Sequence, residues 1–86
     1  MAVLYREKSE HRRVVEEFVH EFERRTSGQL ELIDIDTKQG ANMAELYDIT
    51  EYPAVLATAD DGSMQNMWVG EPLPLINEVA AYLVER

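Results

Sequence analysis

The chain has 86 residues, enough for one domain with a small core, and we expect residues 1–86 to form that single domain. Its 17 acidic and 8 basic residues give a formal net charge of −9, which excludes nucleic acid and anionic membranes as favoured partners and favours a basic partner. The chain has no cysteine, which excludes disulfides, thiolate catalysis and zinc–sulfur sites. No stretch reaches the roughly 20 apolar residues of a membrane span, and the apolar run at 1–5 is too short for a signal peptide, so a cytoplasmic protein is expected.

The first third of the chain predicts a strand followed by an amphipathic helix. Residues 2–5 are continuously apolar, which is typical of a strand covered on both faces. Ser9 is expected to cap the helix, and Gly28 to end it in a left-handed conformation. Glu21 and Arg25 have the favourable spacing for an ion pair on its polar face. The apolar stripe of this helix consists of Val14, Val15, Phe18, Val19 and Phe22.

The middle of the chain predicts a second strand and a short helix. Residues 30–36 alternate in polarity, and apolar side chains on both faces (Leu32 on one, Ile33 and Ile35 on the other) indicate an interior or near-interior strand. Residues 37–42 are expected to form a loop, and residues 43–49 a helix. The first strand, its helix and the second strand would form a right-handed parallel βαβ unit.

The last part of the chain predicts a hairpin and a closing helix. Strands are expected at 54–59 and 63–69, joined by a turn over 60–63 that contains Asp61-Gly62. Gly70 ends the second of these strands, and Pro74 suits the first turn of a last helix. The apolar stripe of that helix consists of Ile76, Val79, Ala80 and Leu83. The order β-α-β-α-β-β-α predicts an α/β fold, with a four-stranded mixed sheet and helices on both faces.

This order resembles the thioredoxin fold, in its short glutaredoxin-like form. The stretch "VLYREKSEHRRVVEEFVHEF" is similar to the family's first strand, C-x-x-C loop and helix, with residues 9–12 at the four motif positions. The stretches "LELIDIDT" and "LYDITEYPAVLAT" are similar to the family's second strand, the end of its second helix and the strand opened by a cis-proline, here Tyr52-Pro53. "MWVGEP" is similar to the closing Val-Gly turn, although Glu71 and Pro72 stand where glutaredoxins usually have a second glycine and an acid.

The resemblance implies a groove between residues 9–12, Tyr52-Pro53 and Gly70-Glu71, where the Tyr52 backbone would pair with an extended segment. Because both motif cysteines are absent, we expect a redox-inactive binding domain that has no cofactor and is not an enzyme. Its expected partner is an extended peptide or protein segment, preferably a basic one. The ligand-binding candidates are Ser9, Glu10, His11, Arg12, Tyr52, Pro53, Gly70 and Glu71. Two alternatives stay open: a glutathione-binding, transferase-like protein that uses Ser9 or Arg6, and a small homodimeric assembly subunit.

Several of these residues also have simpler interpretations. His11 is expected to be a solvated side chain, and His11 and His20 fall on different sides of the helix, so they cannot share a metal. The acidic residues Asp34, Asp36, Asp60 and Asp61 suit capping and turn roles. No catalytic residue and no metal ligand is therefore predicted.

The last strand is the second candidate surface. Alternation predicts Met64, Asn66 and Trp68 on one face of this strand, and Val69 in the core. If the short second helix leaves Met64 and Trp68 uncovered, the two side chains would form an apolar interface at the sheet edge.

Overall fold

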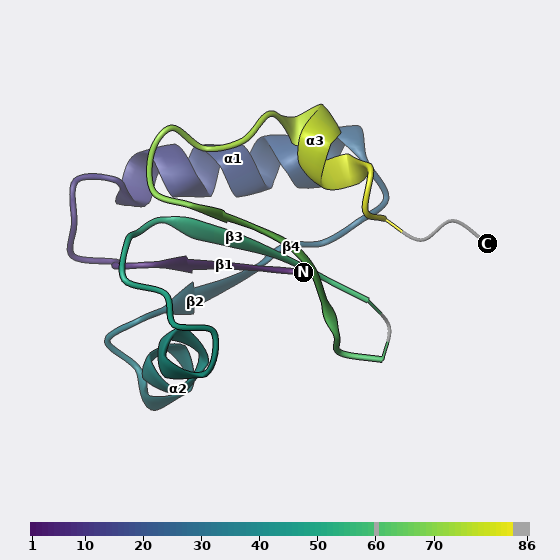
Figure 1. Cartoon of the computed structure of the whole chain (residues 1–86). Coiled ribbons are helices and arrows are strands. Elements are labelled where there is room, and N and C mark those ends of the chain that lie inside the picture. The colour runs from purple at the N-terminus through teal and green to yellow at the C-terminus, as the bar shows by residue number, and fades with distance from the viewer. Residues whose placement is uncertain (60, 84–86) are drawn as a thin grey trace.

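The computed structural model describes residues 1–59 and 61–83, which form an α/β fold with a four-stranded mixed sheet and helices on both faces (Figure 1). Its elements are β1 (Ala2–Tyr5), α1 (Arg12–Arg25), β2 (Glu31–Asp34), α2 (Lys38–Leu46), β3 (Ala54–Thr58), β4 (Met64–Val69) and α3 (Ile76–Ala80). The strands lie in the order β2-β1-β3-β4, with β1 parallel to β2 and β3 antiparallel to both β1 and β4. The predicted order of elements is confirmed.

The core consists of one apolar layer on each face of the sheet. Helices α1 and α3 cover one face, and α2 covers the other (Figure 1). Alternate residues of a strand point to opposite faces, and helices cover both faces of the sheet. The side chains of the central strands β1 and β3 are therefore buried on both sides. The buried residues under α1 and α3 are Val3, Tyr5, Val15, Val19, Phe22, Leu30, Val55 and Val79. Those on the α2 side are Ala2, Leu4, Ile33, Ile35, Ile49, Ala54 and Leu56.

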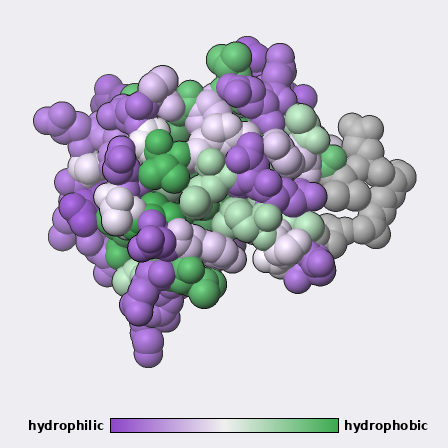
Figure 2. Space-filling view, in the orientation of Figure 1, coloured by the Kyte–Doolittle hydropathy of each residue, from purple (hydrophilic) through white to green (hydrophobic). Residues whose placement is uncertain are grey.

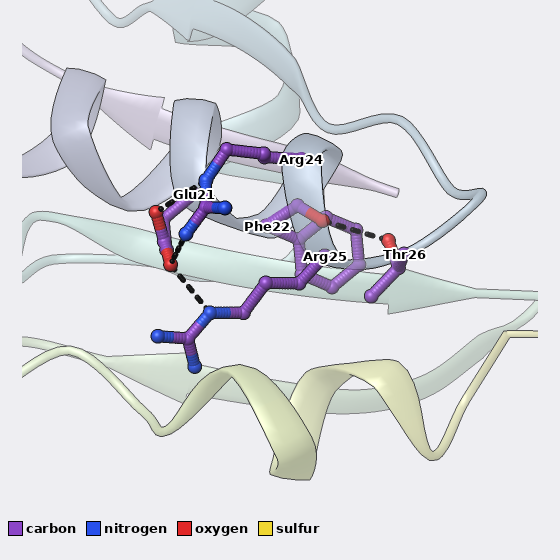
Figure 3. Close-up of polar contacts among 5 residues, drawn as sticks. All are labelled: Glu21, Phe22, Arg24, Arg25 and Thr26. Carbon is purple, nitrogen blue, oxygen red and sulfur yellow. Dashed lines mark hydrogen bonds and ion pairs between the residues drawn. The ribbon is translucent and has the colours of Figure 1, made fainter.

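Both ends of α1 differ from the prediction. The helix begins after His11, and the Ser9 hydroxyl donates a hydrogen bond to the Arg6 carbonyl oxygen (2.6 Å), so Ser9 does not cap it. At the other end the N–H and the hydroxyl of Thr26 both donate to the Phe22 carbonyl oxygen, at 3.0 and 2.8 Å (Figure 3). Thr26 therefore caps the helix before the chain reaches Gly28, which is not left-handed. Val14, predicted to be in the apolar stripe, is 48% exposed.

The predicted ion pair between Glu21 and Arg25 is confirmed, and Arg24 joins it (Figure 3). Arg24 Nη2 lies 2.6 Å from Glu21 Oε2, and Arg25 Nε contacts the same oxygen. The hydrogen bond from Arg24 is the main cause that lowers the pKa of Glu21, and the same bond raises the pKa of Arg24. The pair is exposed, so its contribution to the free energy of unfolding is small, but both cations also lie favourably in the last turn of α1.

Two predictions in the middle of the chain are wrong. Strand β2 lies at the edge of the sheet and not in its interior. Leu32, which made both faces look apolar, is 36% exposed at this edge. Helix α2 begins at Lys38, inside the predicted loop, because the Thr37 hydroxyl accepts a hydrogen bond from the Gly40 N–H (3.1 Å) and caps the helix. It ends at Leu46, ahead of Asp48, whose positive φ of 56° cannot continue a helix.

The hairpin of β3 and β4 contains a bulge that changes the expected faces of β4. The predicted turn has Gly62 at φ 89°, while Asp60 lies outside the described residues. Ala57 pairs with Asn66 and Thr58 with Met64, so Gln65 is an extra residue in the ladder.

The consequence of this bulge is that Met64 and Trp68 do not share a face. Met64 packs on the α2 side, and Trp68 packs under α1 and α3, where its ring meets the edge of Tyr82 at a centroid distance of 5.6 Å. The predicted common interface of Met64 and Trp68 is therefore wrong. Val69, predicted to lie in the core, is 41% exposed because β4 is an edge strand.

Candidate functional site

The three segments expected to form a groove lie at the same end of the sheet (Figure 1). β1 ends at Tyr5 and continues into the loop 6–11, which leads to α1. Leu4 pairs with Ala54, so the Tyr52-Pro53 peptide lies beside the end of β1. Ala54 in turn pairs with Val69, and the Gly70 N–H donates to the Pro53 carbonyl oxygen at 2.9 Å. The topology thus brings the loop, Tyr52-Pro53 and Gly70 to one edge of the molecule.

The side chain of Tyr52 is held in place, whereas its backbone N–H and carbonyl oxygen have no hydrogen-bond partner in the described residues. The peptide bond between Tyr52 and Pro53 is cis, as predicted, and the bond between Glu71 and Pro72 is also cis. The Tyr52 ring packs against the α2-side core, and its hydroxyl donates to the Ile49 carbonyl oxygen (3.2 Å). Within residues 1–59 and 61–83, neither the N–H nor the carbonyl oxygen of Tyr52 forms a hydrogen bond. Both backbone groups of Tyr52 are therefore without a hydrogen-bond partner in the described ranges.

The loop 6–11 is held by hydrogen bonds to the backbone of its own first residue. The Arg6 carbonyl oxygen accepts the Ser9 hydroxyl (2.6 Å) and the Ser9 N–H (3.2 Å), and the Arg6 N–H donates to His11 Nε2 (3.1 Å). His11 is half-buried and shapes this loop, which corrects the prediction of a solvated histidine. Ser9 and His11, two of the four motif-position residues, therefore have partners within the protein.

Two ion pairs join charged residues of the loop and the start of α1 to neighbouring carboxylates. Arg6 Nε lies 3.6 Å from Asp36 Oδ1, and Arg12 Nε lies 3.5 Å from Glu16 Oε2, while Glu10 is exposed. Burial is the main cause that raises the pKa of Tyr5 at the end of β1, and the carboxylates of Glu7, Glu16 and Asp34 add to it. The loop therefore presents charges of both signs.

The turn roles predicted for Asp34 and Asp61 agree with their contacts, whereas the Asp36 carboxylate pairs with Arg6. Asp34 Oδ1 accepts the Asp36 N–H (2.9 Å), and Asp61 Oδ1 accepts the N–H and the hydroxyl of Ser63, at 2.9 and 2.7 Å. The hydrogen bond from the Ser63 backbone is the main cause that lowers the pKa of Asp61. Across residues 1–59 and 61–83, no three histidine, aspartate or glutamate side chains are grouped as metal ligands.

Glu51 is a site residue that the sequence reasoning missed. Gly70 has a φ of 82°, and a Cβ built on it would lie 2.9 Å from Glu51 Oε2, so the Glu51 carboxylate lies directly over the Gly70 backbone. The signal that could have identified it is its position immediately before Tyr52. Glu71, which follows Gly70, is exposed.

The site is an open edge and not an enclosed cavity. The hollow beside the loop is lined by residues of the loop and the start of α1, among them Lys8, Ser9 and Arg12, but by neither Tyr52 nor Gly70. Figure 2 shows a molecular surface on which apolar residues in the middle of the view are surrounded by hydrophilic ones. Small-molecule sites are usually concave and enclosed. An open backbone edge is better suited to an extended chain.

None of the helices in the described ranges is both long enough and apolar enough to cross a membrane. Comparisons with protein-family models, curated proteins and solved structures gave no match.

Proposed function

We propose that this chain is a redox-inactive, thioredoxin-like domain of the short glutaredoxin-like form, which binds an extended peptide or protein segment along Tyr52. The strand order β2-β1-β3-β4 supports the resemblance, as does the position of Pro53 beside the end of β1 and the loop that leads into α1. The 86 residues contain no cysteine, so the domain has no thiol chemistry of its own. Recognition is the function that such a site retains.

The observation that carries this proposal is that the backbone N–H and carbonyl oxygen of Tyr52 form no hydrogen bond within the described residues. An N–H and a carbonyl oxygen without partners at the start of a strand offer a place where an extended segment adds by backbone hydrogen bonds. Pro53 has no N–H to donate, so Tyr52 supplies the donor at this edge. The Tyr52 ring and hydroxyl are held by the core, which fixes the position of the backbone groups before binding.

A nuclear magnetic resonance titration of ¹⁵N-labelled protein tests the proposal. The probe is a blocked heptapeptide of alternating threonine and valine, with a lysine in the middle. Amide shifts are expected at Glu51, Tyr52 and Gly70, and in the loop 6–11, but not in α3. The matched control is the same peptide N-methylated at alternate residues, which cannot complete a ladder. Absence of shifts at Tyr52 and Gly70, or equal shifts with the methylated peptide, would refute backbone pairing.

A second candidate is assembly through β4. β4 is the outermost strand on its side of the sheet, and its last residue, Val69, is 41% exposed, which are features of a pairing edge. Sedimentation at rising protein concentration tests it, with Val69→Lys as the variant expected to prevent association. A monomer at every concentration would exclude this candidate.

A further inference from the structure

The two edge strands of the sheet differ in the side chains that they present to an approaching strand. β2 carries an acidic residue at each end, Glu31 and Asp34, and charged side chains on an edge strand disfavour pairing with another chain. β4, the opposite edge, has the sequence MQNMWV, which contains neither a charged residue nor a proline. Charge on the strand itself therefore does not prevent pairing at β4.

The backbone groups of Met67 and Val69 form the outer edge of β4. The Gly70 N–H donates to the Pro53 carbonyl oxygen at 2.9 Å, so every second residue before Gly70 also directs its backbone groups toward β3, as far as the bulge. The residues between them, Met67 and Val69, direct their N–H and carbonyl groups away from the sheet. These are the groups to which a further strand would bond.

The side chain of Asn66 already occupies one of these groups. Its Oδ1 accepts the Met67 N–H at 2.8 Å, and its Nδ2 donates to the Tyr82 hydroxyl at 3.0 Å. The Tyr82 ring packs edge to face on Trp68 at a centroid distance of 5.6 Å. Both ends of the Asn66 amide are therefore held, and a further strand reaches the Met67 N–H only after this side chain turns away.

The bulge in β4 limits the edge on the other side of Asn66. Gln65 is the extra residue there, and it interrupts the regular ladder. Bulges at a sheet edge bend the strand and disrupt pairing. Regular pairing at the outer edge is thus confined to Met67 and Val69, and Asn66 occupies the N–H of the first.

We propose that the Asn66 side chain blocks the outer edge of β4 against a second copy of this chain. A second copy is the partner that needs to be excluded, because two β4 strands paired with each other bring no like charges of their own face to face. The exposed Val69 side chain would also be covered in such a pair. The inference limits assembly through β4, the second candidate function, and does not depend on binding at Tyr52.

Sedimentation equilibrium of the wild type and of Asn66→Ala, at rising protein concentration, tests this block. High salt is used because it screens the net charge of −9 on each copy. Removing one competing hydrogen bond should favour pairing about fivefold in each copy, and thus lower the dissociation constant of a symmetric pair about 25-fold. The matched control is Gln65→Ala, which removes the neighbouring exposed amide and should sediment like the wild type.

A double variant separates pairing at β4 from aggregation of a damaged fold. Adding Val69→Lys to Asn66→Ala should restore the monomer, because a charge at this position opposes strand pairing. Association that persists in the double variant would refute the proposal. Equal sedimentation of the wild type and Asn66→Ala would also refute it: if both associate, assembly through β4 is supported without a block, and if both are monomers, that assembly is excluded as well.

Hydrogen exchange at the Met67 amide gives a second measurement on the monomer. The exchange should be faster in Asn66→Ala than in the wild type, because the amide loses its acceptor. Unchanged exchange at Met67 would show that Asn66 does not hold this N–H and would refute the block. Exchange at the Gly70 amide, which is bonded to Pro53, should be the same in both proteins and serves as the internal control.

Discussion

Replacing Gly40 with alanine should destabilise the fold, although the same change at an exposed helix position is stabilising. Gly40 is buried in the first turn of α2, where the helix meets the end of β2. A Cβ at this position would lie 2.1 Å from the Asp34 carbonyl oxygen and 2.7 Å from Ile35 Cα. Backbone atoms cannot rotate away as a flexible side chain can, so α2 would have to move away from the sheet.

Two opposing effects determine the size of the loss. In an exposed helix, alanine is favoured over glycine by about 1 kcal/mol. An extra methyl group in a well-packed site costs about 1–3 kcal/mol, occasionally more. A contact of 2.1 Å with a backbone oxygen places Gly40→Ala at the upper end of that range. The expected net loss is therefore about 2 kcal/mol, a large part of the 5–15 kcal/mol that holds a typical domain together.

Urea unfolding measures this loss, with the fluorescence of the single tryptophan, Trp68, as the signal. The control is Asn42→Ala in the same helix, at an exposed position, which should raise the free energy of unfolding by about 0.5 kcal/mol. If Gly40→Ala were as stable as the wild type while the control behaved as expected, the close contact between α2 and the Asp34 carbonyl would be refuted.

Three further predictions concern pH and the loop. Burial raises the pKa of Tyr5, so its stabilising contribution is present below the unfolded-state value of about 10 and lost as the pH rises through the folded-state pKa. As the pH rises above about 10, the stability of Tyr5→Phe should thus fall less than that of the wild type. Urea midpoints that fall equally with pH in the two proteins would contradict the prediction. The hydrogen bond from Arg24 lowers the pKa of Glu21, so the stabilising contribution of the Glu21 carboxylate is present above about pH 4.3 and is lost as the pH falls through the folded-state pKa. Glu21→Gln should therefore reduce the fall of the urea midpoint at acidic pH. An unchanged fall would contradict this prediction. His11→Ala removes the acceptor of the Arg6 N–H, which should cost about 1 kcal/mol and speed hydrogen exchange at that amide, whereas unchanged exchange would show that His11 is not the acceptor.

Features decided by neighbouring residues could be predicted from the sequence. The ion pair of Glu21 and Arg25 follows from the helix period, and the Asp61-Gly62 turn follows from the ability of glycine to take a positive φ. The order of strands and helices follows in the same way from the repeats of apolar residues.

Features decided by pairing between distant residues could not be predicted in this way. The bulge at Gln65 reverses the faces of the residues before it, but alternation along a single strand assumes an unbroken ladder. Leu32 looked interior because it is apolar, yet its exposure follows from the place of β2 at the sheet edge. Thr37 is a residue type that caps helices, but the weak apolar pattern of the stretch after it does not predict a helix there.

In the candidate site, too, the sequence indicates which residues are present but not which hydrogen bonds they form. Ser9 and His11 stand at two of the four motif positions, but hydrogen bonds to the Arg6 backbone already use the Ser9 hydroxyl and His11 Nε2. Changes to these two side chains should therefore act through the shape of the loop. A partner along Tyr52 would instead meet a backbone N–H and carbonyl oxygen, which can pair with any extended chain.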